Sequence, residues 1–127
     1  MTENEIATQI VDAALKVHRA LGPGLLETVY ESALEYELRD RGLQVERQVP
    51  IAVRYERMRA ETGFFADLLV EQKVLVEVKS VEYVSPVVYK SVLTCMRFAQ
   101  VKLALVINFH ETLLKDGIKR LVLGLEE

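Results

Sequence analysis

Apolar residues recur every three or four positions at the start of the chain, which predicts an amphipathic helix beginning at Glu3 or Asn4. The apolar positions are Ile6, Ile10, Ala13, Ala14, Val17 and Leu21. Gly22-Pro23-Gly24 then breaks the pattern. A second helix follows, for which Gly42 is the expected C-terminal stop. One face of this helix is predicted to carry Leu26, Tyr30, Ala33, Leu34 and Leu38.

From Leu43 the apolar period changes to two, which predicts an extended strand. Its apolar positions are Leu43, Val45, Val49, Ile51 and Val53. Pro50 within it indicates an edge strand or a bulge. We expect residues 56–63, ending in Gly63, to form a turn. Two further strands, at residues 64–70 and 74–79, are separated by the short polar turn Glu71-Gln72-Lys73.

The last third of the chain contains one more helix and two more strands. Ser85 is the expected cap and Pro86 the first residue of a helix that runs to about Ala99. The β-branched run at residues 103–109 predicts a buried strand. Asp116-Gly117 forms a turn before a short strand at residues 118–123. The predicted order is α-α-β-β-β-α-β-β, a mixed sheet with helices packed on it, in an α/β fold.

The length of 127 residues suits a single domain spanning residues 1–127. The single cysteine, Cys95, permits no internal disulfide and fits a reducing compartment. The polar, acidic N-terminus does not resemble a signal peptide. The longest apolar stretch, residues 103–107, is too short to span a bilayer. We therefore expect a cytoplasmic protein with no membrane partner.

Charge is distributed unevenly along the chain. The net charge of -3 and the pI near 5.5 exclude a protein held on nucleic acid by a strong overall basic field. Residues 39–59, however, contain six arginines against three acidic residues, a local charge of +3. Two interpretations stand side by side: a solvated surface of mixed charge, or a strip that faces phosphates.

Three charged residues interrupt strands that otherwise read as buried: Asp67, Glu77 and Lys79. Burying isolated charges is costly, so these groups need partners or a metal. If residues 71–73 form a three-residue loop, Asp67 lies directly opposite Glu77, with Cβ atoms about 4.5–5.5 Å apart. Lys79 lies two residues beyond Glu77 and shares its face.

Hard oxygen ligands of this kind suit Mg²⁺ or Mn²⁺. Such an ion polarises a phosphoryl oxygen and activates water, and a nearby ammonium group stabilises the charge that develops on the phosphate. The set therefore suits metal-dependent cleavage of phosphodiesters. The alternative is a buried ion network of Lys79, Glu77 and Asp67 that only holds the hairpin together.

The sequence from Gly24 to Tyr30 reads Gly-Leu-Leu-Glu-Thr-Val-Tyr and matches the motif that gives the GxxExxY proteins their name. The chain resembles this family of the PD-(D/E)xK nuclease superfamily over almost its whole length. Further matches are His18 before Gly-Pro-Gly, residues 66–70, Glu77-Val78-Lys79, Ile107-Asn108-Phe109 and residues 114–120.

The resemblance implies a restriction-endonuclease-like fold and a Mg²⁺- or Mn²⁺-dependent nuclease that acts on DNA or RNA. It also implies that Asp67, Glu77 and Glu27 are metal ligands and that Lys79 is the catalytic lysine. Without the resemblance, Glu27 reads as an exposed first-turn glutamate favoured by the helix dipole. At this size, a homodimer or a partner protein is plausible for substrate recognition.

Three positions depart from the family pattern. Ala66 replaces the proline of the superfamily motif. Ser91 stands where the family usually has a glutamine directed at the site, and Cys95 stands where a tyrosine is expected. A non-catalytic module for binding or assembly, which keeps the fold, is therefore the main alternative. A hydrolase of small phosphate esters would use the same metal chemistry.

Overall fold

The structure is a computed structural model that describes residues 1–126. The chain forms three α-helices, five strands and one 3-10 turn. The helices are α1 (Glu3–Leu21), α2 (Glu27–Asp40) and α3 (Pro86–Ala99). The strands are β1 (Val45–Tyr55), β2 (Met58–Val70), β3 (Val74–Lys79), β4 (Leu103–Asn108) and β5 (Ile118–Val122), with the turn η1 (Leu114–Gly117) before β5.

The strands form one mixed sheet in the order β1-β2-β3-β4-β5. Only β3 and β4 are parallel, and α3 is the crossover between them. The predicted α/β class and the order of its helices and strands are confirmed, consistent with a restriction-endonuclease-like fold. The edge position predicted from Pro50 is also confirmed, because β1 is the outermost strand, and its register shifts between Ile51 and Val53.

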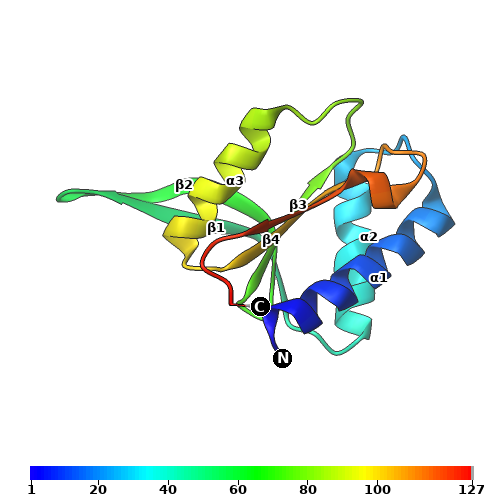
Figure 1. The fold of residues 1–127 in the computed structure, drawn as a ribbon, viewed down its shortest axis with the longest axis horizontal. Helices are drawn as coiled ribbons and strands as arrows, with labels where there is room; N and C mark the ends of the chain where they lie inside the picture. The colour runs from blue at the N-terminus through cyan, green and yellow to red at the C-terminus, as the bar shows by residue number, and fades with distance from the viewer. Residues whose placement is uncertain (127) are drawn as a thin grey trace.

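Helices cover both faces of the sheet. Helices α1 and α2 pack together on one face, and α3 packs on the other (Figure 1). Thr2 caps α1 through a capping box with Glu5, and Ser85 caps α3 as predicted. The β3 side chains alternate between the two cores, with Val76 and Val78 facing α1 and α2 and Leu75 facing α3.

The expected turn at residues 56–63 is wrong. Only Glu56 and Arg57 separate β1 from β2, and Tyr55 pairs with Met58. The residues that follow form the first part of β2, which lies beyond the helices and is largely exposed on both faces. Because neither face is buried there, the sequence lacks the apolar alternation that identifies a strand.

Burial corrects one further assignment and confirms another, the position of Tyr30 on the apolar face of α2. Leu26 lies just before α2 and is 75% exposed, so it does not belong to the buried face of that helix. Tyr30 and Cys95 are buried core residues. Within residues 1–126, no helix combines the length and apolar character that crossing a bilayer requires.

Candidate active site

The β2–β3 hairpin sets the position of the three charged residues. Val70 pairs with Val74, and Leu68 pairs with Val76, as a three-residue loop requires. Glu71 and Gln72 in this loop both have left-handed backbone conformations, with φ of 53° and 58°. The next opposed positions along the two strands are Asp67 and Glu77.

The two strands separate at these positions, and the Asp67 side chain fills the gap. The regular pairing stops at Leu68 and Val76. The Oδ2 atom of Asp67 accepts a hydrogen bond from the backbone N–H of Val78 at 2.8 Å. A side-chain carboxylate thus takes the place of a strand carbonyl, and this bond fixes the carboxylate of Asp67 beside β3.

Glu77 and Lys79 lie next to Asp67 on β3. The Nζ atom of Lys79 is 3.7 Å from Oε1 of Glu77, and the side chains are 25% and 14% exposed, respectively. The structure therefore brings together the three residues that the sequence singled out. It also makes their charges interact in a partly dehydrated environment.

Burial and nearby negative charge raise the pKa of both carboxylates, with Asp67 acting on Glu77 and Glu31 acting on Asp67. Burial raises the pKa of Glu77 to about 8, and the neighbouring charge of Asp67 adds to this increase while Lys79 opposes it. Burial also raises the pKa of Asp67, against the hydrogen bond from Val78. Lys79 alone therefore does not compensate the negative charge of the site.

Glu27 reaches the site from the first turn of α2. Glu27 is half-buried, and its Oε2 atom accepts a hydrogen bond at 3.1 Å from the backbone N–H of Ser80. Ser80 is the residue directly after Lys79. The charge of Glu27 contributes to the raised pKa of Glu77. Ser80 in turn donates from Oγ to the carbonyl of Leu25 at 2.6 Å, which ties the loop before α2 to the end of β3.

Tyr30 has a structural role in the same loop. Its ring is fully buried and stacks on Phe109 with a centroid distance of 4.5 Å. Its hydroxyl donates to the carbonyl of Gly22 and accepts from the backbone N–H of Leu25 at 3.1 Å. The tyrosine of the motif thus holds the loop that precedes Glu27.

Three further residues complete the site, and the sequence analysis missed them. Glu31, one turn after Glu27, is only 4% exposed and forms an ion pair with Arg47 at 3.0 Å. The amide of Gln48 donates to Oε1 of Glu31 at 2.8 Å and to Oδ1 of Asp67 at 3.1 Å. The spacing of Glu27 and Glu31 on one helical face was the available signal.

Gln48 has an unusual backbone conformation, with φ of 51°. It lies opposite Asp67, between the pairs formed by Arg47 with Leu68 and by Val49 with Ala66. Both strands are thus irregular at the same point. A left-handed conformation at a residue other than glycine is uncommon and often marks a functional site.

The residues present suit a hard divalent cation. Glu27, Asp67 and Glu77 oppose the single ammonium group of Lys79, which leaves two negative charges if all three carboxylates are ionised. Within residues 1–126, no three histidine, cysteine or acidic side chains are prearranged as metal ligands. Mg²⁺, however, is usually held by one or two carboxylates together with water and substrate phosphate. Asp67 and Glu77 meet that requirement.

Ser91 of α3 forms no hydrogen bond with Asp67, Glu77 or Lys79 within residues 1–126. It is exposed and lines a cavity of about 240 Å³ with Ile51, Val53, Gly63 and Phe64 of β1 and β2. Burial raises the pKa of the Cys95 thiol to about 11, and the charge of Glu77 contributes a smaller part of this increase. Cys95 is therefore close enough to the site to interact with Glu77. A raised pKa keeps this thiol protonated, so Cys95 is unsuited to nucleophilic chemistry.

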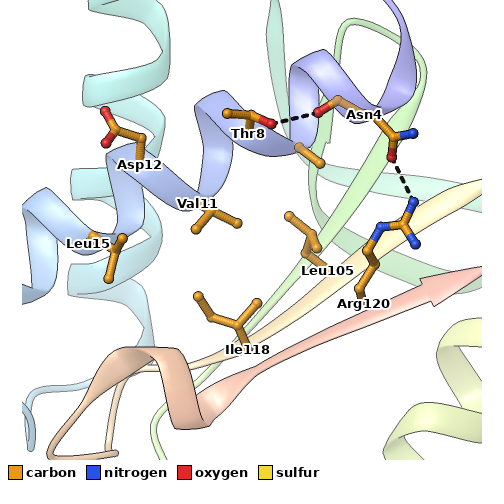
Figure 2. Close-up of a pocket in the computed structure, with 9 residues that line it drawn as sticks. Asn4, Thr8, Val11, Asp12, Leu15, Leu105, Ile118 and Arg120 are labelled. Atoms are coloured by element: carbon orange, nitrogen blue, oxygen red, sulfur yellow. Dashed lines mark hydrogen bonds between the residues drawn. The ribbon is translucent and has the colours of Figure 1, made fainter.

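Two cavities bear on the location of the site. One, of about 510 Å³, opens beside Glu27 and is also lined by Gly24, Leu26, Ser80 and His110. The other, of about 570 Å³, lies between α1 and the β4–β5 side of the sheet and contains none of the predicted site residues (Figure 2).

The walls of the second cavity are mainly apolar. Val11, Leu15, Leu105 and Ile118 line it, and at its rim Arg120 donates to the side-chain oxygen of Asn4 at 2.6 Å (Figure 2). Within residues 1–126, its charged lining residues are Asp12 and Arg120, and it contains no cluster of carboxylates like that at the end of β3. The first cavity, beside Glu27, is therefore the one that adjoins the candidate active site.

Comparison with known proteins identifies the superfamily of the chain. A family model described as the PD-(D/E)XK nuclease superfamily matches residues 4–121. No curated protein and no solved structure matches the chain. The match spans α1 to β5 and includes Glu27, Asp67, Glu77 and Lys79. The chain therefore belongs to the PD-(D/E)XK nuclease superfamily.

Proposed function

We propose that this protein is a Mg²⁺- or Mn²⁺-dependent nuclease that hydrolyses phosphodiester bonds of DNA or RNA. The observation that carries the proposal is the meeting of Asp67, Glu77 and Lys79 where β2 and β3 separate. Nucleases of this superfamily generally depend on divalent metals. The uncompensated negative charge around Glu77 supports the same requirement here.

Each residue has a distinct role in this proposal. Asp67 and Glu77 would hold the ion, and Glu27 stands beside them to complete or orient its surroundings. The ion would polarise the phosphoryl oxygen and make water a better nucleophile. Lys79 presents its ammonium group to the charge that develops on the phosphate. The N–H of Val78 keeps the Asp67 carboxylate in position.

We also propose that the chain belongs to the GxxExxY family within the superfamily. The support is that residues of this motif act together in the structure. Tyr30 holds the loop that begins at Gly22, and this loop places Glu27 beside Ser80. The motif thus couples a buried aromatic ring to the position of a carboxylate at the site.

One observation favours a second candidate, a non-catalytic binding or assembly module. Ser91 replaces the family glutamine and faces a cavity lined by β1 and β2 residues instead of Asp67 and Glu77. Within residues 1–126, no polar side chain of α3 therefore hydrogen-bonds to Asp67 or Glu77 in place of the family glutamine. This candidate predicts metal binding without cleavage.

The test is a cleavage assay on duplex DNA, single-stranded DNA and RNA with Mg²⁺ or Mn²⁺. We expect Asp67→Ala and Lys79→Ala each to reduce the rate by about 10²–10³, the usual effect of losing one well-placed electrostatic group. Asp40→Ala and Lys102→Ala, which change exposed residues away from the site, are the matched controls and should retain activity.

A measurement of Mn²⁺ binding separates the role of Asp67 as a metal ligand from the role of Lys79 in catalysis. Binding is detected as a loss of the electron paramagnetic resonance signal of the free ion. Asp67→Ala should weaken binding, because a ligand is lost. Lys79→Ala should preserve or strengthen it, because a competing cation is removed. Parent protein that binds Mn²⁺ but cleaves none of the substrates would establish the non-catalytic module. Activity that survives both substitutions would come from a contaminant and would overturn the proposal.

A further inference from the structure

Strands β1 and β2 extend well beyond the rest of the sheet. They contain 11 and 13 residues, whereas β3 and β4 contain six each. Since β3 pairs only with Leu68–Val70 of β2, the first part of β2 is paired with β1 alone. The resulting hairpin projects from the body of the molecule at the left of Figure 1. We call residues 54–61 the arm.

The arginine-rich segment from Arg39 to Arg59 divides into two sets in the structure. The three arginines before the arm are paired with acidic residues of α1 and α2 at 3.1, 2.8 and 3.0 Å, and these pairs are Arg39–Glu35, Arg41–Asp12 and Arg47–Glu31. These ion pairs neutralise the first set within the fold. Arg54 and Arg57, the arginines of this segment that form no ion pair within residues 1–126, both lie in the arm.

The arm contains the other three arginines, Arg54, Arg57 and Arg59. All three are exposed, and among them only Arg59 forms an ion pair within residues 1–126, with Glu61 at 3.5 Å, whose side chain is 82% exposed. No carboxylate within residues 1–126 forms an ion pair with Arg54 or Arg57. Surface pairs such as Arg59–Glu61 are weak, so all three guanidinium groups are available to an external anion.

Two of these arginines lie side by side. Arg54 is directly opposite Arg59 across the hairpin, so both side chains project from one face, while Tyr55 and Met58 project from the other. Like charges directly opposite each other destabilise a strand pair. An anion that binds between them removes this repulsion, and guanidinium groups match phosphate in a two-pronged geometry.

The arm and the candidate active site lie on the same strand. Eight residues of β2 separate Arg59 from Asp67, which corresponds to at most about 26 Å at 3.3 Å per residue. Duplex DNA rises 3.4 Å per base pair, so this separation spans about eight base pairs. A free phosphate or a mononucleotide cannot reach both places, whereas a polynucleotide can.

We propose that the arm binds the phosphate backbone of the polynucleotide substrate, about eight nucleotides from the bond that is cleaved. This inference rests on the proposed nuclease function. The arm contains three arginines and two glutamates, Glu56 and Glu61, and so has a net charge of +1 in a chain with an overall charge of -3. Binding is thus confined to one projecting element, and the substrate follows β2 from the arm to Asp67.

The test measures affinity as a function of salt in EDTA, where cleavage does not interfere. The probes are fluorescent 30-base-pair duplex DNA and a 30-nucleotide single strand, followed by anisotropy. The variant replaces Arg54, Arg57 and Arg59 with glutamine. The control replaces Lys16, Lys102 and Lys115 with glutamine, which changes the net charge equally without altering β1 or β2.

We expect the arm variant to reduce the slope of log K against log salt by about 3 for the duplex, since each lost phosphate contact removes about one unit. The slope should fall by about 2 for the single strand. The lysine control should leave both slopes unchanged. Replacing the three arginines with lysine should retain most of the parent slope, which separates charge from folding. Equal effects of the arm and lysine variants would overturn the proposal.

A small diester, bis(p-nitrophenyl) phosphate, separates the arm from the chemistry. It is too short to reach the arm, so the arm variant should hydrolyse it at the parent rate while cleaving the long duplex more slowly. If the parent cleaves nothing but its salt slope still depends on the arm, the nuclease proposal and the position of the arm relative to a cleaved bond fail, and binding of the phosphate backbone by the arm stands. If the arm variant keeps the parent salt slope but changes the oligomeric state, the arm contacts a second copy of the chain, and the arm proposal is overturned.

Discussion

Replacing Glu77 with glutamine should remove the pH dependence of stability that this carboxylate imposes on the metal-free protein. The pKa of Glu77 rises from 4.5 to about 8, first because of burial and then because of the charge of Asp67. The folded state therefore retains a proton that the unfolded state loses at lower pH. The stability associated with this proton is present below pH 4.5 and is lost as the pH rises to about 8.

The size of the effect follows from the shift. Each pKa unit corresponds to about 1.4 kcal/mol, so the full change between pH 4.5 and 8 has an upper limit on the order of 5 kcal/mol. The Glu77 side chain is 14% exposed, and water that enters the site lowers this penalty. We expect the free energy of unfolding of the parent, relative to Glu77→Gln, to fall by about 2–4 kcal/mol over this range.

Urea denaturation followed by circular dichroism, at pH 5 to 8.5 in EDTA, measures this difference. The Glu77→Gln variant is the internal reference, because all other titrating groups are common to both proteins. Asp67→Asn should lower the pKa of Glu77, because it removes the neighbouring negative charge, and should therefore weaken the pH dependence of stability. Saturating Mg²⁺ should also reduce it in the parent, because the ion favours the ionised carboxylate. A difference that does not vary with pH would refute the proposed desolvated contact of Asp67 with Glu77.

Two further predictions concern the supports of the site. Tyr30→Phe should reduce the free energy of unfolding by about 1–3 kcal/mol, because it removes the hydroxyl bonded to Gly22 and Leu25 in a buried position; a loss in urea denaturation below about 0.5 kcal/mol would contradict this role. Gln48→Gly should be more stable than Gln48→Ala by about 1 kcal/mol, because both remove the amide but glycine tolerates the φ of 51°. Equal melting curves of these two variants would show that the backbone at this position is unstrained.

The sequence determined most of the fold and the location of the site. The apolar periods identified the three helices, and the alternation on β3 exposed Glu77 and Lys79 as charged residues within a buried strand. The three-residue loop fixed the register that places Asp67 opposite Glu77, because strand pairing allows few alternatives once the loop length is known. These are local rules, and the residues that follow them are close together in the chain.

The tertiary structure decided features that depend on distant segments or on the absence of burial. The continuation of β2 through residues 58–63 was missed because an exposed hairpin has no buried face to impose alternation on its sequence. The partnership of Glu31, Gln48 and Asp67 joins α2, β1 and β2, and no local spacing encodes it. The pairing of the arginines at residues 39–59 was also decided by tertiary structure, because α1 and α2 supply carboxylates to the first three, whereas Arg54 and Arg57 in the arm form no ion pair within residues 1–126.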